Sequence, residues 1–240
     1  MYAIFIIGGA FGGGNMFQAN QSYKLFGELL GIPNYLYGII LAVLVAIVIV
    51  GGIKRIGQTT EKIVPLMVVL YVAASLFIIL TNVSKLPGVL SAIVSQAFAP
   101  AALYGGFVGV LVTGIKRAVF SNEGGVGSAS IAHSAAKTDE PVREGIVAMV
   151  GPFIDTIVVC FMTASVILIT ADTNQMYIDN MNQIANGTAV KIQGAELTSA
   201  AFGSVISWFP NVLAIVVFLF SFSTMISWYY YGDKGWKYLF

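Results

Sequence analysis

Polar residues of several kinds gather in one short block, FSNEGGVGSASIAHSAA at residues 120–136. The carboxylate Glu123 is followed by three glycines and several hydroxyls. A continuous helix facing lipid would not contain these residues, and non-helical backbone at membrane depth is tolerated only where protein buries it or where it lines a wet cavity. The ends of a broken helix present free N–H and C=O groups to ligands. Free N–H groups near Gly127 and Ser128 would suit a carboxylate.

The same block has a second interpretation, as an ordinary cytoplasmic loop followed by a surface helix. Lys116 and Arg117 would then mark the point where the preceding helix leaves the membrane. Composition alone favours neither interpretation.

Amide side chains follow a glycine-rich stretch in GGAFGGGNMFQANQ, residues 8–21. Asn15 and Gln18 are three residues apart, so on a helix they share a face and could point together into a cavity. Hydrogen bonding between helices is the alternative. The glycine pairs Gly8/Gly12 and Gly9/Gly13 have the four-residue spacing that lets two helices approach closely.

Asp155 lies within the apolar segment GPFIDTIVVC. An ionisable residue inside a membrane span is by default a candidate functional residue. An ion pair with Lys116 or Arg117 is the structural alternative.

Hydroxyl residues cluster in FSFSTMISWYYYGDKGW, residues 220–236. Sodium is a hard cation that takes oxygen ligands, and the adjacent Ser223 and Thr224 could supply two of them. Hydroxyls that bond back to their own helix are the alternative. Trp228 belongs either to an aromatic belt at the membrane interface, with the tyrosines that follow it, or to the wall of a cavity.

Other reactive side chains give little support for enzymatic chemistry. His133 and Cys160 are the single histidine and the single cysteine, which excludes an internal disulfide and disfavours a metal centre. We expect His133 to be a packed or loop residue and Cys160 to be an inert packing residue. The spacing of Ser128, His133 and Asp155 does not indicate a catalytic triad, so we predict that the protein is not an enzyme.

The composition indicates a membrane protein. The chain is 58% hydrophobic and only 10% charged, whereas a soluble domain carries about a quarter charged residues. The net charge of +1 gives no support for binding nucleic acid. The lipid bilayer is the solvent that such a chain requires.

Charge-free stretches predict an all-α protein with about six spanning segments, one of them discontinuous. We expect helices near residues 2–22, 35–52, 63–81, 145–170 and 210–231, and a broken helix over 105–136. Lys54, Arg55 and Lys62 place the loop after the second helix in the cytoplasm. The 82–104 and 171–200 segments then lie outside, which makes a multi-pass protein of the plasma (inner) membrane.

Several motifs resemble those of the alanine or glycine:cation symporter family. They are GNMFQAN at 14–20, GGIKRI at 51–56, EKIVP at 61–65, STMISWYYYGDK at 223–234, and above all the long block at 120–164. The resemblance covers nearly the whole chain. Gly124, where the family usually has alanine, and Ser130, where it usually has proline, are mild departures.

The resemblance implies a single transmembrane transporter domain over residues 1–240, part of a five-plus-five inverted-repeat bundle like that of the neurotransmitter-sodium symporters. It implies sodium-coupled symport of a small neutral amino acid, alanine or glycine, by alternating access, with Na⁺ as coupling ion and no other cofactor. The implied substrate-binding residues are Asn15, Gln18, Asn122, Gly124, Gly125, Gly127, Ser128 and Trp228. Ser223 and Thr224 resemble the sodium-binding hydroxyl pair, and Glu123 and Asp155 are further intramembrane charges.

One departure from the family pattern is large. The family's first helix carries a second unwound segment that shares the substrate and sodium sites, and neither it nor the last core helices match residues 1–240. We therefore expect this chain to be a fragment that does not transport alone. A non-transporting membrane subunit is the alternative.

Overall fold

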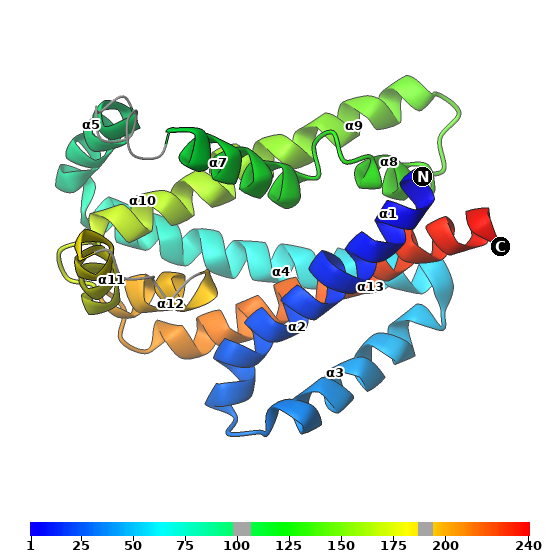
Figure 1. Cartoon of the computed structure of the whole chain (residues 1–240), viewed down its shortest axis with the longest axis horizontal. Coiled ribbons are helices and arrows are strands. Elements are labelled where there is room, and N and C mark those ends of the chain that lie inside the picture. The colour runs from blue at the N-terminus through cyan, green and yellow to red at the C-terminus, as the bar shows by residue number, and fades with distance from the viewer. Residues whose placement is uncertain (98–106, 187–193) are drawn as a thin grey trace. The chain divides into compact units, whose positions relative to one another are not determined.

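The computed structural model describes residues 1–97, 107–186 and 194–240, and each regular element within these ranges is helical (Figure 1). The chain forms two compact units. Unit 1 comprises Met1–Ala74 and Thr173–Phe240, and unit 2 comprises Ser75–Asp172. The all-α class predicted from composition is confirmed. Parts of the expected 82–104 and 171–200 loops and of the 105–136 region lie outside the described residues.

The first helical run of unit 1 alternates between two helix types. It consists of α1 (Tyr2–Gly9), the π-helix η1 (Ala10–Met16), α2 (Phe17–Ser22) and the π-helix η2 (Tyr23–Gly27). A π-turn closes hydrogen bonds over five residues rather than four and is common at functional sites. This run corresponds to the expected helix near 2–22 and is one turn longer.

The rest of unit 1 consists of longer helices and two short ones. They are α3 (Asn34–Ile49), most of α4 (Gly52–Thr81), α11 (Gln175–Ala185), α12 (Ala195–Gly203) and α13 (Phe209–Leu239). The predicted loop around Lys54 and Lys62 is wrong, because α4 already begins at Gly52. Lysine, arginine, glutamine and glutamate are good helix formers, so the helix continues past the end of its apolar stretch.

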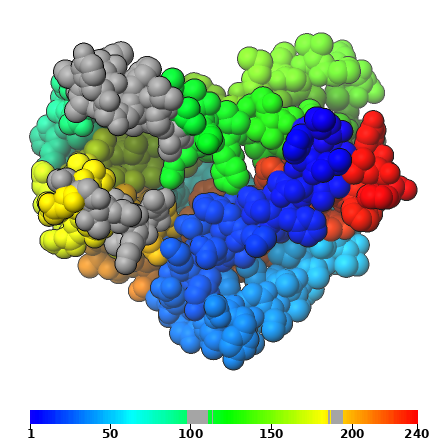
Figure 2. All heavy atoms as spheres, in the orientation of Figure 1, coloured from blue at the N-terminus to red at the C-terminus, as the bar shows by residue number. Residues whose placement is uncertain are grey.

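The α13 helix is the centre of unit 1 and contacts α1, η1, α2, η2, α3 and α12. Figure 2 shows the N-terminal helix in blue beside the red C-terminal end of α13. Glycines make this approach close. A β-carbon at Gly14 would lie 2.5 Å from both Cβ and Cγ of Trp228, and one at Gly9 would lie 3.1 Å from the far edge of the same ring.

The glycine face that was predicted is therefore only partly right. Gly9 belongs to the contact, but a β-carbon at Gly8 or Gly12 would meet nothing within 4 Å. Gly14 takes part instead. The π-turn of η1 changes which residues share a face, which a four-residue spacing rule does not anticipate.

Unit 2 consists of helices that flank a break. They are η3 (Val83–Lys85), α5 (Leu86–Ala97), α7 (Phe107–Asn122), α8 (Ser128–His133), α9 (Pro141–Phe153), the π-helix η4 (Ile154–Cys160) and α10 (Phe161–Ile169). Between α7 and α8 the backbone turns through positive φ at Glu123 (57°), Gly125 (78°) and Gly127 (92°). Right-handed helix cannot continue through such angles. The discontinuity predicted within 120–136 is present.

Within the described residues, three helices are long and apolar enough to cross a membrane: Gly52–Thr81, Pro141–Ile169 and Phe209–Leu239. The helix Asn34–Ile49 is apolar but shorter. The expected helices near 63–81, 145–170 and 210–231 match the three spans, each of which extends beyond its apolar stretch. The first helical run is not among them, because Asn15, Gln18 and Lys24 make its second half polar.

Candidate functional site

Side chains at the end of α7 and at the start of α8 form hydrogen bonds across the break between the two helices. The amide oxygen of Asn122 accepts a hydrogen bond from the Gly124 backbone N–H, 2.8 Å away. The buried Ser128 hydroxyl donates to Glu123 Oε2 at 2.6 Å. The carboxylate that sequence analysis singled out therefore ties the end of α7 to the start of α8 across the break.

The π-helix η4 braces the same break from the side. Asp155 Oδ2 accepts a hydrogen bond from the Ser121 hydroxyl at 2.6 Å, and Asn122 Nδ2 donates to Thr156 Oγ1 at 3.2 Å. Asp155 thus contacts the last turn of α7 through Ser121. In the part of the chain that the structure describes, no ion pair joins it to Lys116 or Arg117, the structural alternative considered above.

Sequence analysis missed two members of this cluster, Ser121 and Thr156, and misjudged a third. Cys160 is exposed rather than packed, and its sulfur lies 3.6 Å from the Ser121 hydroxyl and 3.9 Å from Asp155 Oδ2. The signal available in the sequence was the position of Ser121 and Thr156, each directly next to a predicted site residue.

In unit 1, Asn15 and Gln18 bond to their own helix. Asn15 Nδ2 donates to the Ala10 carbonyl at 2.7 Å, and Gln18 Nε2 donates to the Gly13 carbonyl at 3.4 Å. Both acceptors lie five residues earlier in the chain. The neutral amides therefore stabilise the π-turns, and the amide oxygens remain available to a ligand.

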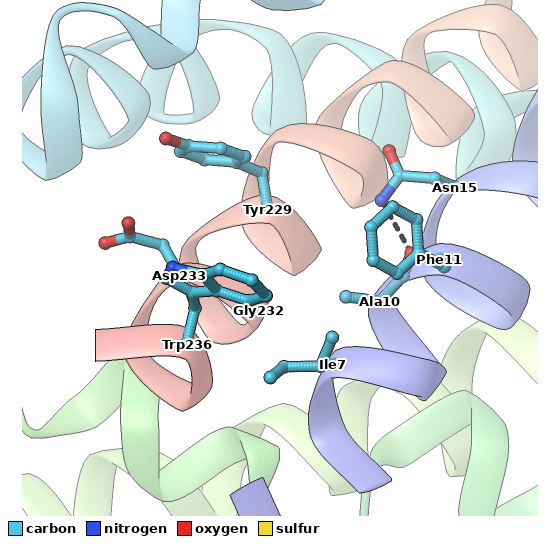
Figure 3. Close-up of a pocket in the computed structure, with 8 residues that line it drawn as sticks. All are labelled: Ile7, Ala10, Phe11, Asn15, Tyr229, Gly232, Asp233 and Trp236. Carbon is cyan, nitrogen blue, oxygen red and sulfur yellow. Dashed lines mark hydrogen bonds between the residues drawn. The ribbon is translucent and has the colours of Figure 1, made fainter. Parts of the chain in front are cut away.

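Asn15 also lines a pocket of about 240 Å³ between the first helical run and α13. Figure 3 shows its amide directed at the Ala10 carbonyl, with Tyr229 and Trp236 on the opposite side. The other lining residues are Ile7, Ala10, Phe11, Gly232 and Asp233. Gln18 does not line this pocket, so the two amides that share a predicted face do not converge there.

Trp228 packs inside unit 1 rather than in an interfacial belt. It is only 8% exposed, lies against Gly9 and Gly14, and meets the Tyr231 ring edge-on at a centroid distance of 5.4 Å. Tyr229, in contrast, is exposed. The ring of Trp228 therefore fixes the spacing between α13 and η1.

The hydroxyls of Ser223 and Thr224 both donate to the Phe220 carbonyl, each at 2.9 Å. This is the local bonding that hydroxyl residues make within helices. Their oxygens keep lone pairs, since a donating hydroxyl is still an acceptor. The two side chains therefore lie together on one turn of α13 with their oxygen atoms oriented by the same carbonyl.

The candidate residues form two sets. Unit 2 holds Asn122, Glu123, Gly124, Gly125, Gly127, Ser128 and Asp155, and unit 1 holds Asn15, Gln18, Ser223, Thr224 and Trp228. In unit 2, bonds to Ser121 and Thr156 bring Asp155 beside Asn122, and in unit 1 Trp228 lies against Gly9 and Gly14 of the first helical run.

Comparison with known proteins decides the family. A sequence model of the Sodium:alanine symporter family matches residues 1–240. The chain belongs to this family. The resemblance stated from the motifs is confirmed.

Curated relatives are similar to this chain over nearly all of its length. The sodium/alanine symporter AgcS of Methanococcus maripaludis is 39% identical over 239 residues, 99% of this chain and 50% of that protein. An uncharacterized transporter of Haemophilus influenzae is 38% identical over 247 residues, 100% of this chain and 51% of that protein. The probable sodium/glutamine symporter GlnT of Bacillus subtilis is 36% identical over 223 residues, 92% of this chain and 44% of that protein. The chain thus spans about half the length of these relatives.

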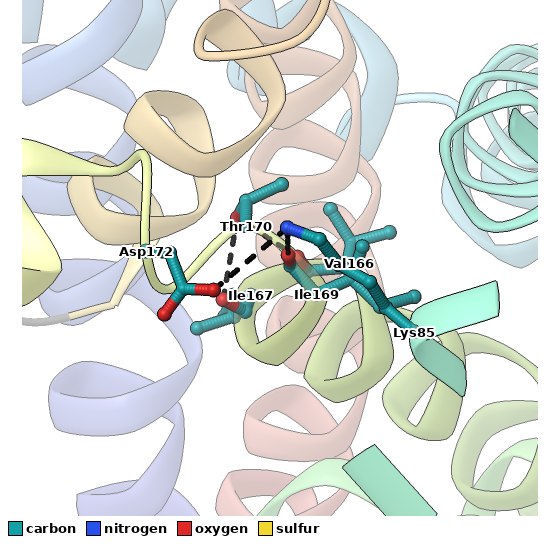
Figure 4. Close-up of polar contacts among 6 residues, drawn as sticks. All are labelled: Lys85, Val166, Ile167, Ile169, Thr170 and Asp172. Atoms are coloured by element: carbon teal, nitrogen blue, oxygen red, sulfur yellow. Dashed lines mark hydrogen bonds and ion pairs between the residues drawn. The ribbon is translucent and has the colours of Figure 1, made fainter. Parts of the chain in front are cut away.

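A lysine that sequence analysis did not single out caps a helix in unit 2. Lys85 Nζ donates to the Ile169 carbonyl at 3.3 Å and lies 3.8 Å from Asp172 Oδ2 (Figure 4). An ammonium group at a helix C-terminus is favoured by the helix dipole. The contact joins the segment after α4 to the end of α10, the helix that continues η4.

Proposed function

We propose that the protein performs sodium-coupled symport of a small neutral amino acid, alanine or glycine, across the plasma membrane by alternating access. The observation that carries the proposal is the break at Glu123–Gly127. There the half-buried Asn122 amide bonds to the Gly124 backbone, and Ser128 at the start of α8 bonds to Glu123. Family membership and the relative named a sodium/alanine symporter support it. An inverted-repeat bundle with one discontinuous helix is the architecture that we propose for the intact transporter.

The substrate would bind at the break through short polar groups. Gly124, Gly125 and Gly127 carry no side chain, so a ligand can approach their backbone closely. Asn122 offers its amide next to them. Backbone groups and one short amide offer partners for the amino and carboxylate groups that every amino acid carries, and the relative named a sodium/alanine symporter favours a small side chain. The relative named a probable sodium/glutamine symporter makes glutamine the competitor to test.

Uptake into proteoliposomes tests this proposal. The expected result is accumulation of labelled alanine or glycine driven by a sodium gradient and absent when potassium replaces sodium, with glutamine taken up poorly. The chain of residues 1–240 and a full-length relative should be assayed side by side. Uptake by the relative alone would favour a non-transporting subunit or a fragment inactive by itself. Sodium-independent uptake by the chain would contradict the proposal.

The sodium ion would bind at Ser223 and Thr224. Replacing both with alanine should raise the sodium concentration that gives half-maximal uptake by about tenfold, because two oxygen ligands are lost. The sodium titration of uptake is the measurement. Ser227→Ala is the matched control, since Ser227 donates to the Ser223 carbonyl one turn further along. An equal shift in the control would show that the hydroxyls serve only the helix.

A further inference from the structure

The short helix α8 has few interactions of its own to hold it in place. It has six residues and begins directly after three positive-φ residues. Its neighbour α9 faces it across a cavity of about 500 Å³. On both sides the lining includes small residues, such as Ala129 on α8 and Gly145 and Ala148 on α9. Small side chains around a cavity make few apolar contacts, so packing alone fixes α8 weakly.

One polar pair joins α8 to α9. His133 Nδ1 lies 2.5 Å from Glu144 Oε1, and the two side chains are 34% and 24% exposed. Among the described residues, α8 makes no other side-chain hydrogen bond to α9. Arg143, next to Glu144, is paired with Glu140 at 2.6 Å, which leaves Glu144 to the histidine. Partial burial strengthens such a charge-assisted bond.

The helical run that bonds to His133 of α8 also bonds to the end of α7, on the other side of the break. From Glu144 the chain continues through α9 into η4, where Asp155 and Thr156 bond Ser121 and Asn122 at the end of α7. One uninterrupted helical run is thus attached to both halves of the broken helix. Its contacts lie eleven residues apart, at Glu144 and Asp155.

We propose that α9 and η4 hold the two halves of the broken helix in a fixed arrangement, and that the His133–Glu144 bond, called the latch below, positions α8. His133 and Glu144 are positioning residues, since they act on the break through α8. The latch keeps Ser128 against Glu123 and makes α8 move with α9, so that bending is confined to Glu123–Gly127. As a statement about transport, the inference rests on the function proposed above; as a statement about α8, it is tested without transport.

The first test is thiol labelling of a full chain that carries Cys160→Ser and Ala129→Cys, in nanodiscs where both membrane faces are accessible. Ala129 is half-buried on the cavity wall. Removing the latch with His133→Ala or Glu144→Ala should make maleimide labelling roughly tenfold faster, as expected for loss of a hydrogen bond to a charged group. Glu140→Ala is the matched control, because that carboxylate pairs with Arg143 and not with α8.

Rescue distinguishes a directed bond from general loosening. An asparagine amide places a donor where Nδ1 stands, whereas a glutamine amide places it near Nε2. His133→Asn should therefore restore slow labelling and His133→Gln should not. Equal labelling in all variants, or equal rescue by both amides, would overturn the latch. In the uptake assay, His133→Ala should raise the KM for the amino acid several-fold, and His133→Asn should reverse this. A labelling change together with sodium-independent uptake would leave the latch standing and remove the proposed function.

Discussion

In the intact transporter, replacing Asp155 with alanine should reduce sodium-driven amino-acid uptake by about 10- to 100-fold. The carboxylate accepts the Ser121 hydroxyl at 2.6 Å, and its neighbour Thr156 bonds Asn122. Without it, Ser121 at the end of α7 loses its strongest bond to η4 and keeps only the longer contact with the Cys160 sulfur at 3.6 Å. Ser121 and Asn122 at the end of α7 should then no longer be held in position beside the break. Initial uptake rates, normalised to the amount of folded protein, are the measurement.

Two variants sharpen this experiment. Asp155→Asn keeps an oxygen acceptor for Ser121 and should lose less activity than the alanine variant if hydrogen bonding matters most. Asp139→Ala removes an exposed carboxylate from the segment between α8 and α9 and should be close to the parent. Uptake by Asp155→Ala within twofold of the parent would contradict a role for this carboxylate.

Replacing Gly14 with valine should unfold or strongly destabilise unit 1. A β-carbon at this position would lie 2.5 Å from both Cβ and Cγ of Trp228, and no side-chain rotation moves that Cβ away. The η1 segment and α13 would have to separate, at a cost of about 3 kcal/mol or more. In detergent, we expect a melting temperature roughly 5 to 10 °C lower, or recovery of aggregate only.

Gly12→Val provides the comparison for this result. A β-carbon at Gly12 meets nothing within 4 Å, and both sites lie in the same π-helix. The two variants therefore share any change in helix propensity, and only the contact with Trp228 differs. Equal melting temperatures for the two variants would show that the close approach of η1 and α13 does not limit stability.

Sequence analysis predicted the features that depend on local composition. Glu123 and three glycines indicated that a regular helix is interrupted, although composition alone did not distinguish a broken helix from a loop followed by a surface helix. The three longest spans were found because twenty apolar residues have few alternatives to crossing a membrane. The alternative for Ser223 and Thr224, bonding to their own helix, was also visible in advance, because hydroxyls do this in any helix.

Features that depend on contacts between distant segments could not be predicted. Trp228 and Gly14 are more than 200 residues apart, and neither sequence neighbourhood indicates that they touch. The bonds from η4 to the end of α7 also require the fold: Asp155 stood out as a carboxylate in an apolar segment, but nothing near it in the sequence indicates Ser121 as its partner. The start of α4 was misplaced because charge was taken as the end of a helix, although charged residues with long side chains are good helix formers.

The π-helices have a consequence for the angular position of every residue that follows them. Each π-turn holds an extra residue, so the helix faces downstream are rotated relative to an ideal α-helix. A helical-wheel projection that starts at Tyr2 is therefore out of phase after Met16 and again after Gly27. The same holds beyond Cys160 for a projection that starts at Pro141. Periodicity in a scan of substitutions along these helices should be read separately on each side of every π-segment, since a single continuous wheel would mix the lipid-facing and protein-facing positions.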